Sequence, residues 1–144
     1  MTVAKKPARV LQDVKINVKL KLCALWVALM FCYTYADILG FYAPGNLGEL
    51  LSGEIAGIQM TQGVLLASAL LMAIPTAMVF LSLTLKARAN RLVNIIVGIV
   101  YLGVLASTLL TGRNPAYYIL YVVGKAALIA LIVWHAWKWP QKQV

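Results

Sequence analysis

The segment Tyr117–Trp137, which reads YYILYVVGKAALIALIVWHAW, decides the fold class of this chain. Its length matches the roughly 20 mostly apolar residues that a helix needs to cross a hydrocarbon core about 30 Å thick. A central lysine costs about 2.5–3.5 kcal/mol on insertion, but each surrounding Leu, Ile or Val returns about 0.3–0.6 kcal/mol. The segment therefore predicts a transmembrane helix that carries Lys125 near its middle.

Three segments of similar length and polarity precede this one. Together the predicted spans are about Leu20–Tyr42, Thr61–Leu85, Leu92–Thr111 and Ala116–Trp137. The chain is 62% hydrophobic and 12% charged, whereas soluble domains average about 45–50% and about 25%. We therefore expect an all-α membrane protein that forms an antiparallel four-helix transmembrane bundle. The bundle covers residues 20–139, and it is flanked by a basic tail, 1–19, and a short tail, 140–144. The first span exceeds the apolar region of a signal peptide, about 7–15 residues, so we expect it to stay in the protein.

The basic residues gather on one side of the predicted bundle. Eleven of the 13 Lys and Arg residues lie before the first span, between the second and third, or after the fourth. The other side carries Arg113, Glu49 and Glu54. By the positive-inside rule, both termini are cytoplasmic. Orientation and attraction to anionic lipid heads explain the basic excess, so the expected partner is the lipid bilayer and not nucleic acid, whose binding favours aromatic residues among the charges.

The connections predict which helices are neighbours. Residues 86–91, KARANR, join the second and third spans, and residues 112–115, GRNP, join the third and fourth. Loops this short make consecutive helices antiparallel neighbours. Between the first two spans, Asn46 and Glu49 have the spacing of an N-cap and its N3 partner, and leucines follow. We expect a short amphipathic helix there, lying on the outer membrane surface.

Two features predict how the helices pack. Pro75 lies inside the second span and leaves the carbonyl of Leu71 without its helical donor, so we expect a kink. Small residues recur every four positions, which lets helix backbones approach closely. We expect helix contacts at these stripes, so substitution of Ala28 or Ala73 by Leu would lower stability by about 1–3 kcal/mol through overpacking. One of the stripes could instead form a homodimer contact, and the sequence leaves this alternative open. The stripes are Ala24, Ala28, Cys32, Ala36 and Gly40; Ala69, Ala73 and Ala77; Gly103, Ser107 and Thr111; and Ala126 and Ala130.

Several kinds of chemistry are excluded. The single histidine, His135, has no second metal ligand near it in the sequence, so neither a transition-metal site nor a catalytic triad can be built around it. Cys23 and Cys32 lie on opposite faces of one span and cannot act as a Cys-x-x-Cys pair. No glycine-rich phosphate loop follows a strand. We therefore expect no metal, no cofactor and no catalytic residue, and the pattern favours a protein that is not an enzyme.

A set of polar residues within the spans remains. An ionisable residue inside a span is a functional-site hypothesis by default, and it is expected to face the bundle interior. The fourth span carries one polar stripe that ends at Lys125, and the first span carries Tyr33 one turn before Asp37. The candidate ligand-binding residues are Tyr33, Asp37, Gln62, Tyr118, Tyr121 and Lys125.

We expect the ammonium of Lys125 to point outward and into the bundle, where it forms a buried pair with Asp37. Removing one partner of such a pair costs about 3–5 kcal/mol, whereas removing both can be nearly neutral. A lysine that snorkels alone, or a pair that serves the structure only, explains the sequence equally well.

Three runs of sequence resemble an uncharacterised family of small four-span bacterial inner-membrane proteins, a domain of unknown function. They are LWVALMFCYTYADILGFYAPG (25–45), GEIAGIQMTQGVLLASALLMAIPTAMVFLS (53–82) and ANRLVNIIVGI (89–99). The resemblance covers residues 19–139 and implies a four-helix fold in a bacterial inner membrane without an assigned activity. The chain is also loosely similar to DoxX-like proteins, some of which accompany quinone-linked redox systems, but it shows no motif that carries a redox role.

Two functional classes follow from these observations. In the first, the protein binds or transports a small molecule in an outward-facing polar cavity, as a homo-oligomer because four short spans enclose little volume. In the second, it is a non-catalytic accessory or structural subunit of a larger membrane complex, and the polar residues only fix the helix register.

Overall fold

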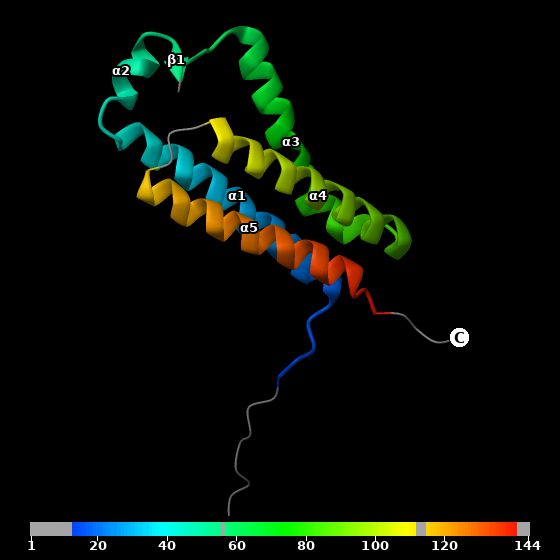
Figure 1. Ribbon diagram of the computed structural model, residues 1–144. Coiled ribbons are helices and arrows are strands. Elements are labelled where there is room, and N and C mark those ends of the chain that lie inside the picture. Colours follow the sequence, from blue (N-terminus) through cyan, green and yellow to red (C-terminus); the bar gives the residue numbers. More distant parts are fainter. Residues whose placement is uncertain (1–12, 56, 112–114, 141–144) are drawn as a thin grey trace, which may run out of the picture.

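Four long helices dominate the computed structural model, which describes residues 13–55, 57–111 and 115–140 (Figure 1). They are α1 (Val18–Tyr42), α3 (Gln62–Thr84), α4 (Ala87–Thr111) and α5 (Ala116–Trp137). A short helix, α2 (Asn46–Leu51), and two short strands, β1 (Glu54–Ile55) and β2 (Ile58–Gln59), lie between α1 and α3. The four long helices have the length and apolar composition to cross a membrane. The predicted all-α class is confirmed, and the chain is a multi-pass membrane protein.

The long helices run in alternating directions, so each end of the molecule has its own character. The described chain begins and ends at one end, which also holds the connection between α3 and α4; we call it the termini end (Figure 1). The opposite end, the loop end, holds α2, β1, β2, the end of α4 and the start of α5. The first and last described residues therefore lie at the same end of the helices.

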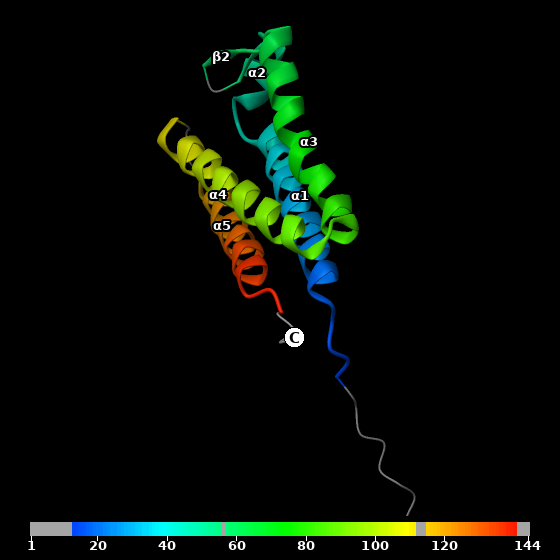
Figure 2. The same ribbon diagram turned by 90° about the vertical axis from the view of Figure 1, so that its right-hand side faces the viewer.

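The order of the helices in space differs from their order along the chain. α1 packs along both α5 and α3, and α5 also packs along α4. α3 and α4 meet near their connection and then diverge toward the loop end (Figure 2). α4 and α5 are thus close neighbours along their length, as predicted. α3 and α4 were also predicted to be neighbours, but they are close at one end only. The first and last helices form a long central pair that loop lengths did not indicate.

The connection between α3 and α4 is shorter than predicted. α4 begins at Ala87 and not near Leu92, so most of the KARANR segment is helical. The reason is Asn90, which is fully buried and donates its side-chain amide to the carbonyl of Ser82 at 2.6 Å. This bond ties the first turn of α4 to the last turns of α3.

The segment between α1 and α3 differs from the prediction in detail. The short helix is present, but Gly45 is its N-cap, with a φ of 88° that glycine reaches at little cost. Asn46 does not cap the helix; its side chain instead donates to the carbonyl of Gly40 at 2.9 Å. β1 and β2 then form a small antiparallel hairpin, which was not predicted from the sequence.

The predicted small-residue stripe is only partly correct for α1, where Ala24 is exposed, and it is wrong for α3. On α1, Ala36 is 3% exposed and Ala28 is half-buried. On α3 the predicted stripe, Ala73 included, is exposed, because the buried face is built from larger or polar side chains. That face consists of Pro75, Met78 and Ser82, and the exposed stripe consists of Ala69, Ala73 and Ala77.

On α4 the small residue in the closest helix contact is one that the stripes did not include. A Cβ at Gly98 would lie 2.6 Å from Cγ2 of Val133 on α5, whereas a Cβ at Gly103 would meet nothing within 4 Å in the described chain. Gly103 and Ser107 are exposed, and the side chain of Thr111 lies outside the described part. Close approach of α4 and α5 therefore depends on Gly98.

Candidate functional site

Lys125 occupies a core position of α5. It is 2% exposed and belongs to the stripe that packs against the other helices, in which its neighbours are apolar. That stripe is Val122, Lys125, Ile129, Ile132 and Ala136. The stripe follows the i, i+3, i+7 spacing of one helix face. The lysine therefore does not extend along the lipid-facing surface of the helix, and the snorkelling alternative does not describe its position.

The ammonium of Lys125 lies against two tyrosine rings. Its Nζ is 4.2 Å from the ring centroid of Tyr33 on α1 and 5.3 Å from that of Tyr118 on α5. Tyr118 lies two turns closer to the loop end, so the side chain of Lys125 extends toward that end. Cation–π attraction is worth about 2 kcal/mol or more where the groups are desolvated.

The hydrogen-bonding capacity of this site is unmet. Within the described ranges, no hydrogen bond or ion pair involves Nζ of Lys125, and the buried hydroxyl of Tyr33 has no partner. An ammonium carries three donors and a tyrosine hydroxyl one. Buried polar groups without partners are costly, and ring faces accept no conventional hydrogen bond. The site therefore holds one fully buried hydroxyl and one ammonium that have no hydrogen-bond acceptor in the described chain.

Asp37 interacts electrostatically with Lys125 but does not contact it. The carboxylate lies one turn beyond Tyr33 on α1 and belongs to an exposed residue. The ammonium of Lys125 interacts with it and, more weakly, with the thiol of Cys32. Across the described part of the chain no ion pair joins the two charged groups, and the predicted pair between them stays a prediction.

Two of the predicted residues do not join this cluster. Tyr121 is half-buried one turn before Lys125, but in the described structure its ring does not lie against the ammonium. Gln62 is exposed as the first residue of α3, and α3 packs on α1 and not on α5. The structure thus brings together Tyr33, Tyr118 and Lys125, with Asp37 at the margin of the cluster.

Tyr101 on α4 is part of the cluster and was not predicted. It is fully buried, and its ring meets those of Tyr33 and Trp26 edge to face, with centroids 6.5 and 6.3 Å apart. Its hydroxyl donates to the carbonyl of Leu71 on α3, which is the carbonyl that Pro75 leaves free. Tyr101 therefore supplies the hydrogen-bond donor that Pro75 removes from α3. Its ring also packs against the ring of Tyr33 and helps to position it. The freed carbonyl could be predicted from Pro75, but not its donor on another helix.

A second buried polar group lies nearer the termini end, and we call it the asparagine hub: Trp26, Ser82, Asn90 and Asn94. The indole nitrogen of Trp26 donates to Oδ1 of Asn94 at 2.7 Å, and the amide of Asn94 donates to Oδ1 of Asn90 at 2.6 Å. Asn90 in turn donates to the carbonyl of Ser82. The hub therefore joins α1, α3 and α4 through hydrogen bonds. Its only signal in the sequence is the i, i+4 spacing of the two asparagines in an apolar helix.

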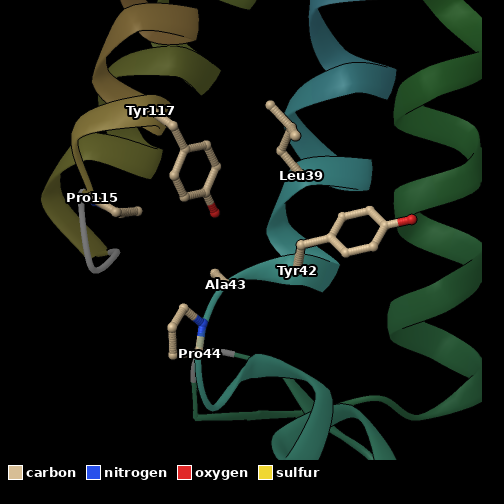
Figure 3. Close-up of a pocket in the computed structure, with 6 residues that line it drawn as sticks. All are labelled: Leu39, Tyr42, Ala43, Pro44, Pro115 and Tyr117. Atoms are coloured by element: carbon tan, nitrogen blue, oxygen red, sulfur yellow. The ribbon is translucent and has the colours of Figure 1, made fainter.

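A pocket opens at the loop end between α1 and α5 (Figure 3). It holds about 350 Å³ and is mostly apolar. Tyr117 extends from α5 toward α1, and its hydroxyl would lie 3.6 Å from a Cβ at Gly40. None of the predicted ligand residues is part of its wall, so it is not the polar cavity that the sequence predicted. The pocket is lined by Leu39, Tyr42, Ala43, Pro44, Pro115 and Tyr117.

Comparison with protein families identifies the chain, but it assigns no chemistry. Residues 11–144 match the Family of unknown function (DUF6326), and because the match covers most of the chain, the protein belongs to this family. The same comparisons found no matching curated protein and no matching solved structure. The looser similarity to DoxX-like proteins is therefore not supported by them.

Proposed function

We propose that this member of a family without assigned activity is a binding module of the bacterial inner membrane, which takes a small molecule with a hydrogen-bond acceptor at Lys125. The observation that carries the proposal is the buried ammonium, which in the described structure has ring faces but no acceptor around it. Tyr33, whose ring lies against the ammonium, has a buried hydroxyl without a partner in the described chain, which adds a second donor. A carboxylate or carbonyl oxygen of a ligand would satisfy both.

Energetics favour a ligand over a purely structural lysine. A methionine or leucine would fill the same position of the α5 stripe without the several kcal/mol that a buried charge costs. The asparagine hub shows that this fold can satisfy its buried polar groups internally when they serve packing. Lys125 lacks such partners, and an unmet buried group of this kind marks a candidate binding position.

The side of the membrane from which a ligand would reach the Lys125 site follows from the distribution of the charges and from the divergence of α3 and α4 toward the loop end. We place the termini end, with its basic residues, in the cytoplasm by the positive-inside rule. The ligand would then arrive from the outer side, where Asp37 is exposed. Labelling of intact cells with a membrane-impermeant thiol reagent tests this orientation in a chain whose native cysteines are replaced by Ala. Asn46→Cys should react and Lys138→Cys should not, and the reverse result would contradict the orientation.

The two native cysteines provide a direct test of binding. Cys32 interacts electrostatically with Lys125, whereas Cys23 lies nearer the termini end of the same helix, and both are half-buried free thiols. We expect short-chain carboxylates such as 4-methylpentanoate to slow alkylation of Cys32 in nanodiscs and to leave Cys23 unaffected. Mass spectrometry resolves the two rates in one sample.

Matched variants decide whether the protection acts through the lysine. Lys125→Met should abolish it, because the ammonium that lies against the Tyr33 and Tyr118 rings is then lost. Lys138→Met should preserve it, because Lys138 is exposed at the end of α5 and lies against the Trp134 ring. The proposal fails if carboxylates and amides leave Cys32 unprotected, or if they protect it equally in Lys125→Met.

An accessory-subunit role is the second candidate, and the exposed face of α3 favours it. The stripe that contains Ala73 is exposed, and small residues at this spacing are typical of contacts between membrane helices. Ala73→Leu should then release the protein from a larger complex in native membranes without lowering its own stability. Unchanged comigration on native gels would contradict this role.

A further inference from the structure

The pocket at the loop end lies where two spanning helices meet the membrane surface. One wall is formed by the last turn of α1 and the residues directly after it, and the other by Pro115 and Tyr117 at the start of α5. Both helices have the length and composition to cross a membrane, so their ends lie between the hydrocarbon core and the head groups. At this depth the molecules around the protein are lipids, and the groups that join their chains to the head groups are esters.

The walls of the pocket suit a hydrocarbon chain. The lining residues are apolar or aromatic, and none carries a charge or a side-chain amide. A charged head group would lose its water there without gaining a partner, whereas methylene groups are stabilised against leucine, proline and tyrosine side chains. Pockets for small molecules hold about 300–1,000 Å³. The volume of about 350 Å³ is therefore enough for part of one chain but not for a whole lipid.

One side-chain hydroxyl belongs to this apolar lining. The hydroxyl of Tyr117 points from α5 into the space beside α1 (Figure 3), and it makes no hydrogen bond within residues 13–55, 57–111 and 115–140. Gly40 leaves room for it, since a Cβ at that position would lie 3.6 Å from the hydroxyl oxygen. A half-buried donor beside apolar walls favours a ligand that carries an acceptor next to a hydrocarbon part.

We propose that the loop-end pocket binds a membrane glycerolipid through one ester-linked chain. The ester carbonyl accepts a hydrogen bond from Tyr117, and the methylene groups next to it lie against the pocket walls. A glycerolipid fits because its ester carbonyls lie at the depth at which both helices end, and because its chain matches the lining. The site goes beyond the proposed function, since none of its lining residues contacts the ammonium of Lys125.

Ester and ether lipids with the same head group and chains test this proposal. Dioleoylphosphatidylcholine carries ester carbonyls, and its di-O-oleyl analogue carries none. Both are added in equal amounts to the full chain in detergent, and native mass spectrometry, which separates the two by mass, counts the complexes that retain one lipid. We expect the ester lipid to be retained at least about threefold more often, a preference that one hydrogen bond of ordinary strength supports.

Matched variants show whether this preference acts through Tyr117. Tyr117→Phe keeps the ring and removes the hydroxyl, so the ratio of ester to ether lipid should fall to about one. Tyr35→Phe is the control, because Tyr35 is an exposed tyrosine of α1 that stacks on Phe31 and does not line the pocket. It should keep the preference of the unmodified chain. Equal retention of the two lipids by the unmodified chain, or a preference that persists in Tyr117→Phe, would overturn the proposal.

A second pair of variants tests whether the chain lies in the pocket. Ala43→Leu places a larger side chain in the lining and should lower the retention of both lipids at least about threefold. Ala130→Leu adds the same side chain to an exposed position of α5 and should leave retention unchanged. Undiminished retention in Ala43→Leu would show that the lipid is bound elsewhere and would overturn the proposed site.

Discussion

The asparagine hub and the Lys125 site are both buried polar groups among apolar helices, and they differ in how their hydrogen bonds are met. In the hub, the indole of Trp26 and the amides of Asn90 and Asn94 donate to oxygens within the protein. At the other site, the ammonium of Lys125 and the hydroxyl of Tyr33 find no acceptor in the described chain. A satisfied network rigidifies a fold, whereas an unsatisfied one costs free energy until something binds. In this protein, whether a buried polar group has hydrogen-bond partners therefore distinguishes structural from candidate functional groups better than its charge or its depth of burial does.

The largest effect is expected in the hub. Asn94→Leu removes the acceptor of Trp26 and the donor to Oδ1 of Asn90, and each buried donor or acceptor left without a partner costs about 1–3 kcal/mol. We expect a loss of about 2–3 kcal/mol in the free energy of unfolding, measured by SDS-induced unfolding in mixed micelles. Leu92→Ala is the control on the same helix, because Leu92 is 59% exposed, and it should change stability by less than about 0.5 kcal/mol. If Asn94→Leu is no more harmful than this control, the hub does not hold the helices together.

The contrast between the two polar groups could be predicted from the sequence only in part. Hydropathy is a local property, so the spans were correct to within a few residues, except at the start of α4. Lys125 stood out because a charge in an apolar segment is costly, and Tyr33 and Tyr118 followed from helical spacing. The hub was missed because a buried asparagine is recognised by its partners, and these lie on α1 and α3.

Helix packing was the least predictable feature, since the face that a helix buries depends on the helix it meets. Ala73 belongs to a regular small-residue stripe but is exposed, while Gly98 belongs to no predicted stripe and is buried against α5. The same limitation applies to Asp37 and Lys125. Their attraction followed from sign and depth along the helices, but the absence of a direct pair depends on distances between helices.

A smaller effect distinguishes the tightly packed and open parts of α4. Alanine at Gly98 would place its Cβ 2.6 Å from Cγ2 of Val133, whereas alanine at Gly103 would meet nothing within 4 Å in the described chain. Both changes gain the same helix propensity, up to about 1 kcal/mol, so their difference isolates packing. We expect Gly98→Ala to destabilise by about 1 kcal/mol and Gly103→Ala to be neutral or stabilising in the same unfolding assay.

Equal results for the two glycine variants would mean that α4 and α5 are not in close contact at Gly98. A larger loss for Gly103→Ala would place the close approach nearer the loop end, and the open half of α4 would then be incorrectly placed.

The smallest effect on stability is expected at the Lys125 site, where substitution should have the largest effect on binding. Lys125→Met removes a buried charge that has no hydrogen-bond partner in the described chain, so the relief of desolvation offsets the lost attraction to the Tyr33 and Tyr118 rings. Asp37→Asn changes an exposed group. We expect each substitution to shift stability by less than about 1 kcal/mol, and the coupling energy of the double-mutant cycle to be below about 1 kcal/mol as well.

A direct buried pair would behave differently, because each single substitution would strand a charge at a cost of about 3–5 kcal/mol and the double variant would recover most of it. The cycle therefore compares two arrangements of the same residues. Coupling of about 3 kcal/mol or more, measured without added ligand, would show that Lys125 and Asp37 close on each other in the membrane. The ammonium would then be satisfied internally, as the donors of the asparagine hub are, and the reason to propose an acceptor at Lys125 would be gone. Weak coupling would show instead that no direct contact connects the two charges.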